Sequence, residues 1–231
     1  MLNKFSINKK TKKEMKKVIV CMLAAVSMLF ASEYVNAQKV SFGVKAGLNL
    51  STWNVDDYEF NPGFHAGGYA NFKFNNMFSV QPEVLYSMEG TQYKFEESNT
   101  ILGKEYYAKS TSTYINHKIA VPVMLQFSPI SRFTIEAGPQ FNFNMFVFIK
   151  GEFETNVPGV SNYSRNSDTE AYNVFEFAVA GGVKFDLTNN MSIGARYVYG
   201  VTPLFSEVWS DGVISEAVKT SNIMISFNYG F

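Results

Sequence analysis

The chain has 231 residues, and its 20 Lys and Arg balance 20 Asp and Glu, so the formal net charge is zero at pH 7. A chain with this charge balance lacks the excess of basic side chains that a nucleic-acid-binding surface needs. We therefore expect no nucleic-acid partner. The single cysteine excludes a disulfide framework within the chain.

Residues 1–37 show the pattern of a cleavable signal peptide. A basic stretch begins at Met15, the segment 18–31 is apolar and uncharged, and small residues stand at Val35 and Ala37. The apolar segment has 14 residues, fewer than the roughly 17–25 that span a bilayer as a helix. We therefore expect cleavage after Ala37, with Met15 as a second candidate start.

Removal of this leader changes the composition of the remaining domain, residues 38–231. The leader holds seven of the Lys and Arg and two of the Asp and Glu, so the mature chain has 13 basic and 18 acidic side chains and a net charge of −5. Cys21 lies in the leader, so the mature chain offers no thiolate metal ligand. Its 194 residues fit one domain.

Eight segments of the mature chain alternate apolar and polar residues with a period of two, which favours strand over helix. In chain order we expect strands at 40–50, 64–74, 78–89, 114–127, 132–147, 173–187, 191–201 and 220–231. The apolar parity of these segments carries no Lys, Arg, Asp or Glu. The segments therefore predict one sheet with two sharply different faces.

The last of these strands ends the chain on an aromatic residue. Polar or small residues form one of its faces, and the other face consists of Ile223, Ile225, Phe227, Tyr229 and Phe231. This pattern is typical of the closing strand of an outer-membrane β-barrel, in which apolar side chains face lipid and polar ones face the lumen.

The expected connections alternate in length. Tight turns fall at 75–77, 128–131 and 188–190, and long loops at 51–63, 90–113, 148–172 and 202–219. Short turns at one end and long loops at the other are typical of membrane barrels. An eleven-residue strand of about 36 Å, tilted by about 40°, is long enough for an apolar band of about 25 Å.

Alternation alone leaves two orientations open, because a secreted lipocalin-like barrel also has eight strands but turns its apolar face inward. The polar parity is rich in glycine, whereas the apolar parity carries most of the Phe. The interior of an eight-stranded barrel has room only for side chains that just fill it. We therefore predict an all-β, eight-stranded, antiparallel up-and-down transmembrane barrel with its aromatic face outward.

Four strand segments carry a resemblance to a known family. The runs at 40–49, 80–87, 136–139 and 196–200 resemble the outer-membrane β-barrel domain family common in Bacteroidota, which includes PorT-like proteins among small porin-family barrels of the OmpA and OmpX kind. The resemblance implies export and insertion into the outer membrane, and for the PorT-like branch a role in a secretion apparatus.

Four charged residues on the polar parity should lie at or below the middle of the lumen. They are Lys45, Glu83, Glu136 and Arg196. Buried charges need partners, so we expect a paired network that fills the interior. The alternative is a selectivity constriction in a pore, but eight strands leave no wide aqueous channel.

The sequence offers little for catalysis. His65 falls on the lumen parity and His117 on the lipid parity, and no serine stands beside His117 in the chain. No phosphate-binding loop or metal-ligand pattern is present. We therefore expect no catalytic residue, no cofactor and no metal.

Aromatic residues in the long loops could anchor a protein or glycan partner, pack loop against loop, or extend the strands above the membrane. They are Tyr93, Phe95, Tyr106, Tyr107, Tyr163, Phe205 and Trp209. We expect an integral outer-membrane protein with a structural or surface-interaction role, in contact with lipid, lipopolysaccharide and the barrel-assembly machinery. The alternatives are an accessory subunit of a secretion apparatus and, more distantly, a secreted soluble ligand-binding barrel.

Overall fold

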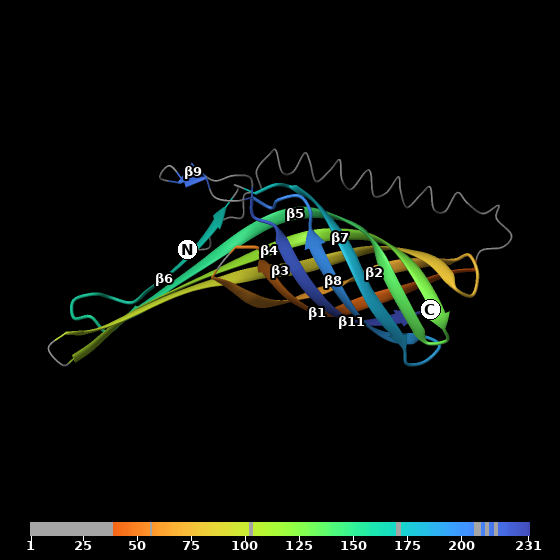
Figure 1. Ribbon diagram of the computed structural model, residues 1–231, viewed down its shortest axis with the longest axis horizontal. Coiled ribbons are helices and arrows are strands. Elements are labelled where there is room, and N and C mark those ends of the chain that lie inside the picture. The colour runs from red at the N-terminus through yellow and green to blue at the C-terminus, as the bar shows by residue number, and fades with distance from the viewer. Residues whose placement is uncertain are drawn as a thin grey trace, which may run out of the picture. The chain divides into compact units, whose positions relative to one another are not determined.

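The computed structural model describes residues 39–55, 57–101, 104–169, 172–205, 209–210, 213–214 and 217–231 (Figure 1). Residues Val40–Phe231 form one compact unit. The expected signal peptide, residues 1–37, lies outside the described residues. Among the described residues, no helix has the length and apolarity that crossing a bilayer requires.

Strands are the regular secondary structure of the described residues. In chain order the strands are β1 (Lys39–Trp53), β2 (Tyr58–Lys73), β3 (Phe78–Ile101), β4 (Lys104–Ile130), β5 (Phe133–Thr155), β6 (Tyr163–Thr169), β7 (Phe175–Asp186), β8 (Met191–Gly200), β9 (Trp209–Ser210), β10 (Val213–Ile214) and β11 (Thr220–Gly230). The short strands β9 and β10 pair only with each other in a separate two-stranded sheet.

Eight of these strands close into a ring. The order β4-β3-β2-β1-β11-β8-β7-β5 is completed by pairing of β4 with β5, and β6 adds to the far edge of β5. The last strand closes on the first, with Val44 opposite Tyr229. Ring neighbours are consecutive in the chain once β6, β9 and β10 are set aside, so the prediction of an eight-stranded antiparallel up-and-down barrel is confirmed.

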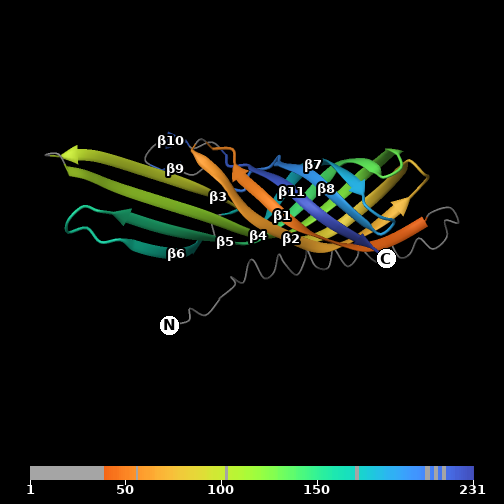
Figure 2. The same ribbon diagram turned by 90° about the horizontal axis from the view of Figure 1, so that it is seen from below.

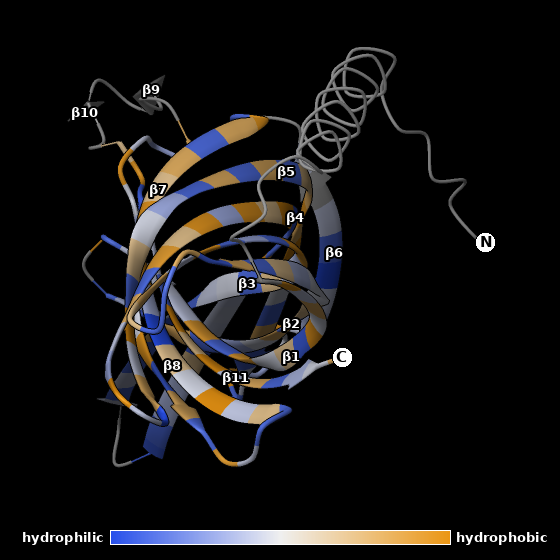
Figure 3. Cartoon of the chain, turned by 90° about the vertical axis from the view of Figure 1, so that its right-hand side faces the viewer, coloured by the Kyte–Doolittle hydropathy of each residue, from blue (hydrophilic) through white to orange (hydrophobic). Residues whose placement is uncertain are grey.

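The ring has its polar side chains inside and its apolar side chains outside. Along β11, Asn222, Met224, Ser226 and Asn228 are buried, whereas the residues between them are exposed. Leu48 and Leu125 keep 67% and 63% of their surface exposed on the outside. Figure 3 shows the resulting alternation of hydrophilic and hydrophobic residues along the ring strands. A soluble barrel would bury its apolar face, so this orientation belongs to a barrel that faces lipid.

Three segments predicted as long loops are mostly strand. β3 and β4 remain paired from Phe78 and Phe127 up to Ile101 and Lys104, which corrects the expected loop at 90–113. β5 continues to Thr155 and pairs with β6, which corrects the loop at 148–172. The expected loop at 51–63 is also mainly strand, because β1 ends only at Trp53 and β2 already begins at Tyr58.

These extensions form a sheet beyond the ring, which we call the projecting sheet: residues 94–101 of β3, 104–113 of β4, 149–155 of β5 and 163–169 of β6. The pairing of β2 with β3 ends at Tyr58 and Tyr93, so β3 runs on from there beside β4 alone. Figures 1 and 2 show these strands reaching well past the other ring strands. β4 has 27 residues and β11 has 11, so β4 is far longer than membrane crossing requires.

Three prolines inside the ring strands interrupt pairing without shifting its register. Beside Pro82, the pairing of β2 with β3 passes from Tyr69 opposite Glu83 to Phe72 opposite Val80. Similar gaps lie beside Pro122 and Pro139 in the pairing of neighbouring strands. Proline has no N–H to donate to the ladder, so each proline produces a local gap and no bulge.

Candidate functional site: the lumen and the projecting sheet

The four charged residues predicted for the lumen lie in mutual contact, and we call them the lumen tetrad: Lys45, Glu83, Glu136 and Arg196. Lys45 Nζ lies 2.6 Å from Glu83 Oε1. The Arg196 guanidinium donates to both oxygens of Glu83 at 2.9 and 3.0 Å, and to Glu136 Oε1 at 2.7 and 2.9 Å. All four side chains are buried. Two cations face two anions, so the tetrad is neutral and each charge has a partner, as burial requires.

Neutral polar side chains complete the hydrogen bonding of the tetrad. Gln81 donates to Glu83 Oε1 at 2.8 Å, and Gln126 donates to Glu136 Oε2 at 3.0 Å. Asn71 in turn donates to the side-chain oxygens of both glutamines. This network spans the lumen from β1, β3 and β5 to β8, as expected for an eight-stranded interior that side chains fill.

A second charge group lies closer to the end that carries the projecting sheet; we call it the upper triad: Glu89, Lys118 and Glu176. Lys118 Nζ lies 2.7 Å from Glu89 Oε2 and 3.8 Å from Glu176 Oε2. Glu89 also accepts a hydrogen bond from Ser87, and Glu176 accepts one from the Thr220 hydroxyl. Sequence reasoning did not select these three residues as a site, although all of them stand on the lumen parity and that parity was the available signal.

An apolar layer separates the two charge groups. On β3, Leu85 lies between Glu83 of the tetrad and Glu89 of the triad, and on β4, Ala120 and Met124 follow Lys118. These residues belong to a buried cluster that also includes Ala178, Ala180, Val198 and Met224. Packed hydrocarbon therefore lies between the two charge groups along β3 and β4.

The lumen also contains a serine, a histidine and an asparagine in hydrogen-bonding sequence. His65 Nε2 lies 2.9 Å from Ser226 Oγ, and His65 Nδ1 lies 2.8 Å from Asn49 Oδ1. Asn49 is fixed in turn by donating to Ser87 and to two backbone carbonyls. The order resembles that of a nucleophile, a base and an orienting group. All three side chains are buried, and their hydrogen bonds link β1, β2 and β11.

The predicted lipid face of the last strand is exposed along its whole length. The exposed fractions of Ile223, Ile225, Phe227, Tyr229 and Phe231 lie between 38% and 75%. Phe231 follows the end of β11, and its backbone N–H donates to the carbonyl of Phe42 at 2.9 Å. The last residue of the chain is thus tied to the first ring strand.

His117 lies half-buried on the outer face of the ring. Its Nδ1 pairs with the Tyr86 hydroxyl, and its ring lies 4.4 Å from that of Phe146 and 5.6 Å from that of Phe148. Aromatic side chains with a polar tip favour the boundary between lipid and water. The arrangement marks the outer edge of the apolar band.

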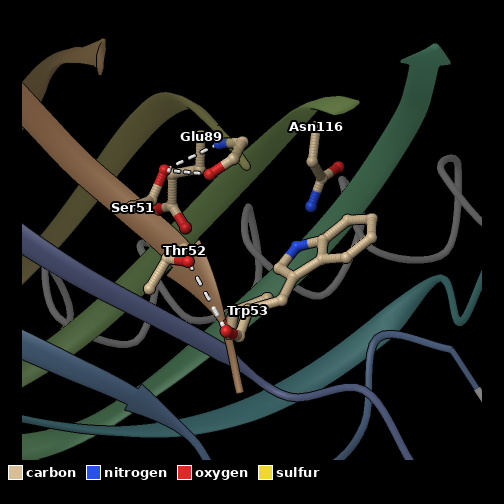
Figure 4. Close-up of a pocket in the computed structure, with 7 residues that line it drawn as sticks. Ser51, Thr52, Trp53, Glu89 and Asn116 are labelled. Atoms are coloured by element: carbon tan, nitrogen blue, oxygen red, sulfur yellow. Dashed lines mark hydrogen bonds between the residues drawn. The ribbon is translucent and has the colours of Figure 1, made fainter. Parts of the chain in front are cut away.

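Aromatic side chains cover the lumen above the upper triad. The indole of Trp53 contacts Tyr58, Tyr114 and Phe205, with ring centroids 4.8–5.6 Å apart. Above the apolar band, burial raises the pKa of Tyr58 to about 12. Between this cover and the triad lies a pocket that Trp53, Glu89, Asn116 and Thr220 help to line, and Figure 4 shows the indole of Trp53 and the amide of Asn116 turned toward each other.

One face of the projecting sheet carries a row of aromatic side chains. Register places Phe95, Ser110, Phe153 and Tyr163 side by side on neighbouring strands. The rings of Phe153 and Tyr163 are stacked 5.3 Å apart. Phe95 and Tyr163 keep 45% and 61% of their surface exposed. We call this set the aromatic row.

The other predicted loop aromatics have different surroundings. Tyr107 lies on the opposite face of the projecting sheet and is 41% exposed, and Tyr106 is half-buried on the side of the aromatic row. Phe205 packs on Trp53. The side chain of Trp209 lies outside the described side chains. Tyr93 contacts the ring of Tyr58. That the loop aromatics anchor a partner stays a prediction.

A polar, charge-paired lumen inside an apolar ring defines the class of transmembrane β-barrels. The family model for the outer membrane protein beta-barrel domain matches residues 36–206. The chain therefore belongs to this family, and it is an integral β-barrel protein of the outer membrane. The resemblance predicted from strand motifs is confirmed at this level.

Solved structures of similar fold are outer-membrane proteins. Ail, the attachment invasion locus protein of Yersinia pestis, is 19% identical with a TM-score of 0.42, over 84% of this chain and 99% of that one. Neisserial surface protein A is 14% identical with a TM-score of 0.43, over 84% and 99%. A major outer membrane protein from Thermus thermophilus is 10% identical with a TM-score of 0.46, over 84% and 100%. No curated protein matches the chain.

Proposed function

We propose that this protein is a surface-interaction protein without catalytic activity, in which the closed barrel is a stem and the projecting sheet binds a protein or glycan outside the cell. The observation that carries this proposal is the exposed aromatic row on strands that continue past the membrane. Strands of this length serve no purpose in crossing lipid, and exposed aromatic side chains are the residues that most often anchor a partner.

The filled lumen supports a role other than transport. The lumen tetrad and the apolar layer leave no continuous water path for a solute, since an aqueous channel takes about 16–18 strands. We expect the purified protein to give low, unsteady conductance in planar bilayers. A large and stable open current would contradict the closed stem.

Removal of part of the projecting sheet tests the binding role. Replacing residues 95–110 by Asn-Gly joins Lys94 to Thr111, which are cross-strand partners, through a two-residue hairpin of favourable type. Intact cells that carry either form are applied to a glycan array and to a panel of immobilised extracellular proteins. The shortened chain should fold in the membrane and lose the ligands that the full chain binds; unchanged binding would contradict the proposal.

Point variants locate the binding surface more finely. Phe95→Ala combined with Tyr163→Ala removes the two most exposed rings of the aromatic row. Tyr107→Ala is the matched control, because its ring is similarly exposed on the opposite face. Binding to the same array ligands should fall at least tenfold in the double variant and stay unchanged in the control. Equal effects would place the ligand elsewhere.

Export and branch assignment complete the proposal. We expect cleavage after Ala37, so that the mature protein begins at Gln38, and folding by the barrel-assembly machinery. Intact-mass measurement on purified outer membranes tests the cleavage site.

Membership of the PorT-like branch, with an accessory role in secretion, would instead give stable co-purification with periplasmic or membrane subunits after crosslinking. Co-purification is then compared in the chain in which Asn-Gly replaces residues 95–110. Its loss there would separate the surface-binding role from the accessory role in secretion.

A further inference from the structure

We propose that the outer compartment of the lumen holds one small hard cation beside the carboxylate of Glu176. This inference concerns the upper triad and the pocket above it, and it is independent of the partner that the projecting sheet binds.

The first support is the charge of the compartment. Glu89 and Glu176 together carry two negative charges, and Lys118 is the cation that contacts them. All three side chains are at least 95% buried. Lys118 lies close to Glu89 but 3.8 Å from Glu176. One carboxylate charge is therefore left without a counter-charge in a site where an uncompensated charge is costly.

The lower compartment does not supply the missing charge. The lumen tetrad is neutral by itself, because Lys45 and Arg196 are both engaged by Glu83 and Glu136. Leu85 on β3 and Ala120 and Met124 on β4 are buried apolar side chains that lie between the two groups along these strands. The excess negative charge thus belongs to the upper triad alone.

The second support is a set of buried polar atoms that lack a hydrogen-bond partner within the described residues. Oε2 of Glu176 and Oδ1 of Asn116 are both of this kind, and both are acceptors. Their side chains are 0% and 2% exposed. A buried acceptor without a donor costs free energy, and a cation satisfies several acceptors at once. These two atoms are acceptors and the triad carries an excess negative charge, which together point to a cation.

The pocket above the triad brings further oxygen atoms to this end of the lumen. Asn116, Glu89 and Thr220 line it together with the hydroxyls of Ser51 and Thr52 (Figure 4), and the Thr220 hydroxyl already donates to Glu176. Among the described residues, no three His, Cys, Asp or Glu side chains gather in a metal-binding group. The ligands on offer are carboxylate, amide and hydroxyl oxygens, which suit Na⁺ or Ca²⁺ better than a transition metal.

Thermal unfolding of the refolded full-length barrel in non-ionic detergent tests the proposal. Unfolding temperatures are compared in Na⁺, Ca²⁺ and N-methylglucamine salts at equal ionic strength and fixed pH, since N-methylglucamine is too large for the pocket. Bound ions stabilise by mass action, so the midpoint should rise by about 5 °C and saturate with Na⁺ or Ca²⁺. A midpoint that does not depend on the identity of the cation, as when Glu176 carries a proton instead, would overturn the proposal.

Glu176→Gln is the decisive variant because it keeps the shape of the side chain and removes its charge. This variant should abolish the difference in unfolding temperature between the ions. The control Glu97→Gln, on the exposed projecting sheet, should keep that difference. A variant of Glu176 that still responds to the ions would also overturn the proposal. If Glu176→Gln does not fold, the ion series on the unaltered protein decides by itself.

Direct binding gives a second measurement. Tb³⁺ is a hard ion whose luminescence a nearby indole sensitises, and Trp53 lines the pocket. We expect saturable luminescence that Ca²⁺ competes away and that falls at least fivefold in Trp53→Phe. Luminescence that Trp53→Phe leaves unchanged would mean that the ion binds elsewhere, and it would contradict the assignment.

Discussion

The ring and the projecting sheet share strands but differ in what their outer faces carry. Along β4, the outward residues within the ring are apolar as far as Ile115, with the exception of His117. Beyond Ile115, toward the start of the strand, they are Thr113, Thr111, Lys109, Tyr107 and Glu105. Along β5, Phe146 and Phe148 give way to Lys150 and then to glutamates. Backbone pairing continues through this boundary without a break in β4. The change in side-chain chemistry therefore marks where the lipid ends, whereas the strands continue past that point.

Ion pairs differ between the two regions in the same way. Arg196 is buried with two carboxylates in the ring, whereas Lys94 and Glu59, at the base of the projecting sheet, form a 2.7 Å pair whose side chains are about half exposed. Water screens the second pair and not the first. The same kind of contact should therefore differ severalfold in its effect on stability.

The largest expected effect comes from breaking the lumen tetrad. Arg196→Met leaves the carboxylates of Glu83 and Glu136 without their guanidinium and should lower the free energy of unfolding by about 3–5 kcal/mol. Lys94→Met should change it by less than about 1 kcal/mol. Urea unfolding of both refolded variants in detergent measures the difference, and equal losses would contradict the contrast between the two regions.

A charge placed on the outer face probes the boundary on β4 directly. Val121→Arg puts a cation on the lipid side near the middle of the membrane-spanning segment and should cost about 2–4 kcal/mol. Thr111→Arg places the same side chain on the same face above the boundary and should stay within about 0.5 kcal/mol. Folding into lipid vesicles, followed by urea titration, compares them; a costly Thr111→Arg would move the boundary outward.

Glycines offer a smaller test of the same contrast. A Cβ on Gly43 would collide with the ring of Tyr69, which covers this glycine in the lumen, and with the carbonyl oxygen of Tyr229. Gly43→Ala should therefore cost about 1–3 kcal/mol. A Cβ on Gly151 in the projecting sheet would have no neighbouring atom closer than 3.7 Å. Gly151→Ala should therefore be nearly neutral. Similar losses in urea unfolding would show that the projecting sheet is as tightly packed as the ring.

The smallest expected effect is the absence of a reaction. Ser226, His65 and Asn49 have the hydrogen-bond order of a hydrolase triad but lie buried in the lumen. A fluorophosphonate probe should leave Ser226 of the folded protein unlabelled, as intact-protein mass spectrometry can measure. Labelling that Ser226→Ala abolishes would show access to the lumen and would contradict a closed, non-catalytic stem.

Much of the ring could be predicted from the sequence, because one face of every strand must suit hydrocarbon and the other a narrow polar lumen. Lys45, Glu83, Glu136 and Arg196 follow from that rule by position alone. The upper ends of the strands could not be predicted in this way. Above the lipid, both faces of a strand carry polar residues, such as Thr111 on one face and Ser112 on the other. The alternation of apolar and polar residues therefore ends where the lipid ends, although the strand continues.

By itself, the sequence determined the strand number, the two faces and the location in the outer membrane, since a period of two and the placement of Phe and Gly are local properties. Only the tertiary structure decided which lumen residues meet. Glu83 and Arg196 stand 113 positions apart, and the upper triad joins β3, β4 and β7. Such contacts depend on the stagger of strands around a closed ring, which the pairing of β1 with β11 fixes and which no single strand encodes.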